Sequence, residues 1–123
     1  MIVVDTSIWV DHLRSEDPRL TVLLTRRLVT MHPWIVGELA CGTFPRRIEV
    51  LRNLQRLPQI PVARNPEVLF FIEQHRLMGC GIGWVDAQVL AAAVAAGGFI
   101  WTRDKRLLAA ATPFGVLYTP PVV

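Results

Sequence analysis

The sequence predicts one α/β domain, residues 1–123, built around a mainly parallel sheet of about four to five strands. Short apolar runs rich in β-branched residues alternate with longer stretches of helical periodicity. Strands separated by helices imply βαβ crossovers, which make neighbouring strands parallel and place helices on both faces of the sheet. The length of 123 residues and a hydrophobic content of 52% suit a single buried core.

Each element has a local signal. Pro45 is expected to open one helix, and Asn65-Pro66 supplies an N-cap and a first-turn proline for another. Gly79 to Gly83 is a glycine-rich connection. We expect helices at residues 7–13, 19–27, 34–41, 45–56, 65–79, 84–96 and 105–111. We expect strands at residues 2–4, 28–30, 99–102 and 116–118, with residues 60–62 as a candidate edge strand.

The apolar content does not predict a membrane protein. Mean hydropathy is +0.38, but the longest apolar run, residues 89–101, is interrupted by Gly97-Gly98. A membrane-spanning helix needs about 20 apolar residues. The N-terminus lacks the basic region of a signal peptide, and Asp5 interrupts its apolar stretch. We therefore expect a cytoplasmic protein with no membrane contact.

The net charge, the cysteines and the histidines exclude few classes of function. The formal net charge of +3 points weakly to an anionic partner, although a run of charge such as the arginines of residues 46–56 is usually a solvated helix face. Cys41 and Cys80 match no metal or redox spacing, so we expect small buried side chains. The histidines share no ligand spacing and are expected to be structural or on the surface; they are His12, His32 and His75.

Four carboxylates interrupt apolar segments. Asp5 follows the first strand, Glu38 lies in a short apolar helix, Asp86 opens an alanine-rich helix, and Asp104 follows the strand at 99–102. Ligand sites in open parallel sheets lie beyond the carboxyl ends of the strands. An ionised carboxylate in apolar surroundings must be paired, protonated or bound to a metal. If the four converge, they form a cation cage.

Each acid also has a purely structural explanation. Asp5 and Asp104 can cap the helices that follow them, and Asp86 can complement the positive end of its helix. Glu38 and Asp86 are harder to explain in this way, because their neighbours three and four positions away are apolar. We therefore expect these two acids to be buried, which favours a site common to all four.

Such a site suits one kind of chemistry. Oxygen ligands without partnering His or Cys favour Mg²⁺ or Mn²⁺ over Zn²⁺. An ion held by the four acids, directly or through water, can activate a water for attack on a nucleic-acid phosphodiester. Thr6, Ser7 and Thr102 lie beside two of the acids and could orient the carboxylates or a bound water. An ordinary helix cap explains Ser7 equally well.

The ordered motifs resemble those of a known family. They are residues 3–11 (VVDTSIWVD), Glu38 in a short helix, residues 83–86 (GWVD) and residues 102–107 (TRDKRL). This set is similar to a PIN domain and, more narrowly, to VapC, the ribonuclease toxin of VapBC toxin–antitoxin pairs. The resemblance spans nearly the whole chain, with all four acids in the family's order.

The resemblance implies a three-layer α/β/α, flavodoxin-like fold and an endoribonuclease that depends on Mg²⁺ or Mn²⁺. It also implies homodimers, an RNA substrate and inhibition by a VapB-type antitoxin. Many relatives carry a fifth acid where this chain has Arg106, which leaves occupancy of a second metal site open. Arg103, Lys105 and Arg106 are candidate contacts to RNA phosphate because they adjoin Asp104.

Other functions fit the residues less well. A haloacid-dehalogenase phosphatase needs a second acid where Ser7 stands, and a receiver domain needs an adjacent acidic pair. A catalytically weak PIN module that binds RNA or a protein without cutting stays open. The four tryptophans can stack on RNA bases, but we favour packing in the core or in a hydrophobic groove for the antitoxin.

Overall fold

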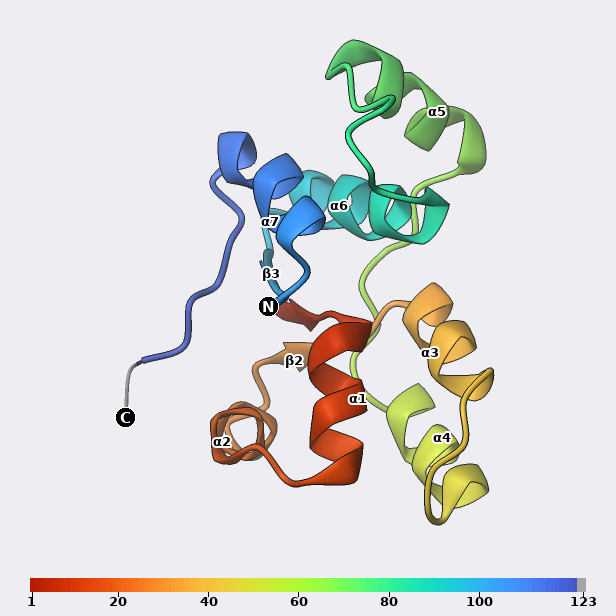
Figure 1. Cartoon of the computed structure of the whole chain (residues 1–123), viewed down its shortest axis with the longest axis vertical. Coiled ribbons are helices and arrows are strands. Elements are labelled where there is room, and N and C mark those ends of the chain that lie inside the picture. Colours follow the sequence, from red (N-terminus) through yellow and green to blue (C-terminus); the bar gives the residue numbers. More distant parts are fainter. Residues whose placement is uncertain (122–123) are drawn as a thin grey trace.

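Three short parallel strands form the centre of the fold. In the computed structural model of Figure 1, which describes residues 1–121, β1 (Ile2–Val4) lies between β2 (Val29–Thr30) and β3 (Phe99–Trp101). Val3 is paired with Thr30 on one side and with Ile100 on the other. The strands are rich in β-branched residues and almost entirely buried, as expected for a parallel sheet covered on both faces.

Single parallel bridges extend both edges of this sheet. Met31 pairs with Gln59, and Ile100 pairs with Leu117. The segments expected as strands at 60–62 and 116–118 thus contribute one bridge each, the first through Gln59. Proline limits both ladders. The next donor to Ile60 would be residue 33, which is proline and begins the following helix, and residues 120–121 are both proline, which has no N–H to donate. The expected parallel sheet is confirmed. In residues 1–121 it consists of three strands, with one bridged segment added at each edge.

The helices match the expected ones closely. They are α1 (Thr6–Arg14), α2 (Pro18–Thr25), α3 (Pro33–Ala40), α4 (Arg47–Gln55), α5 (Asn65–Gln74), α6 (Trp84–Ala96) and α7 (Lys105–Ala111), followed by a 3₁₀ turn at Thr112–Phe114. Three boundaries differ because a residue adopts the left-handed conformation. Arg27 has φ 57°, so α2 ends before it and not at residue 27. Arg46 has φ 55°, so α4 begins after it and not at Pro45; Arg76 has φ 52°, so α5 does not continue to Gly79.

The N-terminus of α5 also differs from the expectation. Arg64 is the N-cap, and Asn65 is the first helical residue. The Asn65 side chain instead accepts a hydrogen bond of 3.0 Å from Gln88 Nε2. Gln88 is fully buried in α6, so its amide requires polar partners. Asn65 supplies one for Nε2, whereas Oε1 has no hydrogen-bond partner within residues 1–121.

Helices cover both faces of the sheet. Figure 1 shows α1 and α2 on one side of it and α6 and α7 on the other. Crossovers between parallel strands are right-handed. The face of the sheet on which a crossover helix packs therefore depends on the direction in which the chain moves across the sheet. It moves one way from β1 to β2 and the other way from β3 to Leu117. The order therefore reverses between β1 and β3, which is where open α/β sheets bind ligands.

The core lies between the sheet and these helices. Val3, Val4 and Ile100 of the sheet are fully buried together with Leu90 of α6. Within residues 1–121, no helix is long and apolar enough to span a membrane.

The two cysteines are exposed, contrary to the expectation that they would be buried. Cys41 is the C-cap of α3, and Cys80 lies in the glycine-rich turn, where its thiol donates to the Leu77 carbonyl. Helix ends and turns lie at the surface, because their backbone groups need solvent.

Candidate active site

Asp5 lies at the carboxyl end of β1, directly beside the end of β3. Its backbone N–H donates to the Trp101 carbonyl at 2.9 Å. Asp5 is buried, with 6% of the residue exposed, and Oδ2 accepts hydrogen bonds from the hydroxyls of Ser7 at 2.7 Å and Thr102 at 2.8 Å. Asp5 is also the N-cap of α1, as its structural explanation predicts. The two hydroxyls hold this carboxylate in one orientation.

Asp104 belongs to the same hydrogen-bonded network. Its backbone N–H donates to Thr102 Oγ1 at 3.0 Å, so one hydroxyl serves both acids. Asp104 Oδ1 caps α7 by accepting from the N–H groups of Arg106 and Leu107, at 2.8 and 3.1 Å. The cap occupies one carboxylate oxygen. Asp104 is exposed, so its other oxygen can take a further partner.

Glu38 joins the site from α3. Its Oε1 accepts a hydrogen bond of 2.7 Å from the Thr6 hydroxyl at the start of α1. Glu38 is exposed, so the expectation that it is buried was wrong. The helix buries its opposite face through Ile35 and Leu39, whereas the neighbouring Trp34 is 40% exposed. An apolar sequence around an acid therefore did not require burial here, because this face of α3 borders a groove.

Asp86 is half-buried in the first turn of α6. Burial, together with the negative charges of Asp5, Asp104 and Glu38, raises the pKa of Asp86 to about 6. The other three acids are thus close enough to act on the fourth. An edge-to-face contact between Trp34 and Trp84, with ring centroids 6.5 Å apart, joins the two helices that carry Glu38 and Asp86.

The donor set fits a hydrated hard cation. Within residues 1–121, the ion pairs involve acids other than these four, namely Asp11, Asp17, Glu49 and Glu67. In the same residues, no three His, Cys, Asp or Glu side chains are close enough to ligate one ion together, so the acids do not form a closed cage. Mg²⁺ usually keeps several waters and is bound by only one or two carboxylates.

Comparison with known proteins identifies the family. The sequence model of the PIN domain matches residues 2–113. This chain belongs to the PIN-domain family. It is 46% identical over 117 residues to ribonuclease VapC32 of Mycobacterium tuberculosis, both in strain CDC 1551 / Oshkosh and in strain ATCC 25618 / H37Rv, with 94% of each chain covered. The resemblance to VapC proteins expected from the four motifs is confirmed.

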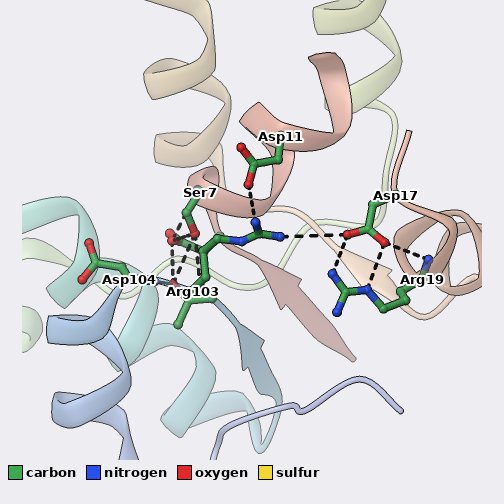
Figure 2. A network of polar contacts seen from close by, with 8 residues as sticks. Ser7, Asp11, Asp17, Arg19, Arg103 and Asp104 are labelled. Carbon is green, nitrogen blue, oxygen red and sulfur yellow. Dashed lines mark hydrogen bonds and ion pairs between the residues drawn. The ribbon is translucent and has the colours of Figure 1, made fainter. Parts of the chain in front are cut away.

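The basic residues next to Asp104 have different surroundings in this PIN domain. Lys105 and Arg106 are exposed, and the Arg106 stem lies against Gly81, where an added Cβ would come within 2.7 Å of Arg106 Cδ. Arg103 instead turns toward α1, where its guanidinium pairs with Asp11 at 2.5 Å (Figure 2). Arg103, one of the three residues expected to contact RNA phosphate, is therefore already paired with an acid of this chain.

Sequence reasoning missed the role of Asp17 beside the PIN site. Asp17 is the N-cap of α2, and its carboxylate binds Arg19 through Nε at 3.1 Å and Nη2 at 2.8 Å, which lowers the pKa of Asp17 (Figure 2). Arg19 in turn lies over the Trp101 ring, 5.5 Å from its centroid. Asp17-Pro18 is a recognisable helix start, but nothing in the sequence links it to β3.

His32 is structural, as expected, but fully buried. Its Nδ1 accepts a hydrogen bond of 3.1 Å from the Trp34 N–H and so caps α3, the helix that carries Glu38. The cap requires a neutral ring, and burial lowers the pKa of His32 in agreement with this.

Proposed function

We propose that this VapC homologue is a metal-dependent endoribonuclease that acts as the toxin of a type II toxin–antitoxin pair. The observation that carries the proposal is the gathering of four carboxylates at the ends of the strands, without an arginine or lysine partner in residues 1–121. The pKa of Asp86 agrees with this arrangement, because burial first and then the charges of the other three acids raise it. Such an acidic cluster is unfavourable unless a cation joins it. The relatives named ribonucleases support RNA as the substrate.

The proposed roles follow from how each acid is held. Asp5, oriented by Ser7 and Thr102, presents a fixed carboxylate at the end of β1. Asp104 keeps one oxygen for a ligand while the other caps α7. Because its pKa is about 6, Asp86 is mostly ionised at neutral pH.

Glu38, positioned by Thr6, completes the proposed set of four acids, which would hold the ion partly through water. When bound, Mg²⁺ or Mn²⁺ would lower the pKa of a water and neutralise charge on the phosphodiester oxygens. The side chains of this site would then have to hold and orient the ion, and none of them need act as the nucleophile.

We further propose a VapB-type antitoxin as the protein partner. A hollow of about 360 Å³ lies beside Glu38, lined by Pro33, Trp34, Gly37, Cys41 and Val85. Its apolar wall suits a hydrophobic peptide segment, and a segment bound there would cover the acids.

We also propose a homodimer located in the cytoplasm. The exposed Leu69 and Phe70 on α5 support it, because large apolar side chains side by side on a helix surface are typical of an interface.

The test is cleavage of total RNA from the source cell by protein unfolded and refolded to remove any bound antitoxin. We expect discrete fragments with Mg²⁺ or Mn²⁺, none with EDTA, and none with Asp86→Asn. Glu73→Gln, a matched change at an exposed acid on α5, is the control and should cut normally. Circular dichroism should show that both variants are folded.

Two outcomes would contradict the proposal. An Asp86→Asn variant that cuts at the normal rate would remove Asp86 from the reaction. Intact RNA in every lane, from folded protein that still retains RNA on a filter, would instead support the non-cleaving PIN module.

A further inference from the structure

Arg103 connects three segments of the chain beside the proposed active site. Its guanidinium lies 2.5 Å from Asp11 Oδ2 in α1 and 4.0 Å from Asp17 Oδ2 at the start of α2. Its backbone N–H donates to Ser7 Oγ at 3.3 Å. Figure 2 shows the side chain reaching from the loop after β3 across to these two helices. The loop between β3 and α7 is therefore fastened to α1 at both its backbone and its side chain.

The residues on either side of Arg103 belong to the carboxylate site. Thr102 donates to Asp5 and accepts from the Asp104 backbone, and Asp104 is itself one of the four acids. The path of residues 102–104 therefore sets both the hydroxyl that orients Asp5 and the place from which the Asp104 carboxylate projects. Any group that holds residue 103 controls the relation between these two acids.

Asp17 makes the anchor a closed ring of contacts. Arg19 holds the Asp17 carboxylate through two hydrogen bonds and also lies over the Trp101 ring in β3. From Trp101 the chain continues directly to Arg103, which returns to Asp17. Because contacts hold both its backbone and its side chain, Arg103 has little freedom to move.

We propose that Arg103 is a positioning residue, which uses its ion pair with Asp11 to hold Asp104 and Thr102 at the correct distance from Asp5. The proposal rests on the proposed function, because it assigns to Arg103 the geometry of the metal-holding acids. It replaces the expectation that the Arg103 side chain contacts RNA phosphate.

The exposure of the pair argues for positioning over stability. The Arg103 side chain is 49% exposed and that of Asp11 is 45% exposed. Ion pairs between side chains this exposed contribute little to folding stability. Metal ligands, in contrast, respond strongly to the groups that orient them, and loss of such a group costs about 10–100-fold in metal affinity. We therefore expect the pair to affect metal binding far more than the melting temperature.

The test is a double-mutant cycle with Asp11→Asn, Arg103→Gln and the combined variant. Mn²⁺ binding to the whole chain is measured by calorimetry without RNA, and kcat and KM for RNA cleavage are measured separately. Each single variant should raise the Mn²⁺ Kd by about tenfold. The combined variant should be no worse than either single variant, because one change already breaks the pair.

Two further variants make the result specific. Arg103→Lys keeps the charge and should recover part of the Mn²⁺ affinity. Arg14→Gln, the same change at an exposed arginine at the end of α1, should leave the affinity unchanged.

An RNA-contact role for Arg103 predicts the opposite pattern. Arg103→Gln would then raise KM for RNA at unchanged Mn²⁺ affinity, and Asp11→Asn would lower KM by releasing Arg103 to bind phosphate. That result would overturn the proposal while leaving the nuclease function intact. If wild-type protein binds no Mn²⁺, or Asp86→Asn binds it equally well, the proposed function and the positioning role both fail.

Discussion

The Thr102 hydroxyl donates a hydrogen bond of 2.8 Å to Asp5 Oδ2 and so joins two residues that are 97 positions apart in the chain. The strand pairing makes this contact possible, because Val4 lies opposite Trp101 and the next residue on each strand enters the site. The contact crosses the point where the strand order reverses. The reversal thus brings an acid from the beginning of the chain next to a hydroxyl and an acid from near its end.

Replacing Thr102 with valine should weaken both the fold and the site. The variant leaves Asp5 with one donor fewer and leaves the Asp104 N–H without its acceptor, at a cost of about 1–2 kcal/mol in the free energy of unfolding. The Mn²⁺ Kd should rise by about tenfold or more, because both acids lose an orienting contact. Urea unfolding and calorimetry measure the two effects.

Thr112→Val is the matched control for this change. Thr112 is exposed, and its hydroxyl donates to the Leu108 carbonyl in the preceding helix α7, so Mn²⁺ binding should not change. Equal effects of the two substitutions on Mn²⁺ affinity would argue against an orienting role for Thr102.

Asp86 should make the stability of the metal-free protein depend on pH. Its folded pKa of about 6 lies above the ordinary value of 3.8, so between these values the folded state binds more protons than the unfolded state. The contribution of Asp86 to stability is therefore fully present below the ordinary pKa and is lost as pH rises through the folded pKa. In EDTA, Asp86→Asn should be more stable than wild type by about 1–2 kcal/mol near neutral pH, since half-burial and salt reduce the full effect.

The measurement is denaturant unfolding in EDTA at neutral pH and at a pH below the ordinary carboxyl pKa. The stabilisation by Asp86→Asn should disappear at the acidic pH, where Asp86 is neutral in both states. A gain of the same size at both pH values would mean that the charge of Asp86 is not its cause.

Gly81→Ala should be the most destabilising of three alanine substitutions in the glycine-rich turn. Gly81 has φ +91°, and an added Cβ would lie 2.7 Å from Arg106 Cδ. Gly79 has φ +74° with open space around it, so Gly79→Ala carries only the backbone cost of about 1 kcal/mol. Gly83 has φ −95° and open space, so Gly83→Ala should have little effect.

Melting temperatures of the three variants check this order. Adding Arg106→Ala to Gly81→Ala should recover the part of the melting temperature that is lost through the close contact. The part lost through the positive φ of residue 81 should remain lost. If Gly83→Ala proved the most damaging, neither the backbone conformation nor the Arg106 contact would explain the turn.

Local signals predicted most of the elements. Pro18, Pro33 and Pro66 each lie in the first turn of a helix, and α6 ends, as expected, just before the glycine pair at residues 97–98. These boundaries depend on the backbone limits of single residues, which are properties of the sequence itself. The left-handed Arg46 and Arg76 could not be read in this way, because arginine has no local preference for that conformation.

The candidate site, like the secondary structure, could be predicted from local signals only in part. The sequence by itself determined which four acids interrupt apolar segments, and it placed Asp5 and Asp104 at strand ends, since strand and helix periodicity are local. Only the tertiary structure decided that Glu38 is exposed, that Asp86 lies near three other carboxylates, and that Arg103 pairs with Asp11. Those facts depend on which distant segments pack together, and packing is a property of the whole fold.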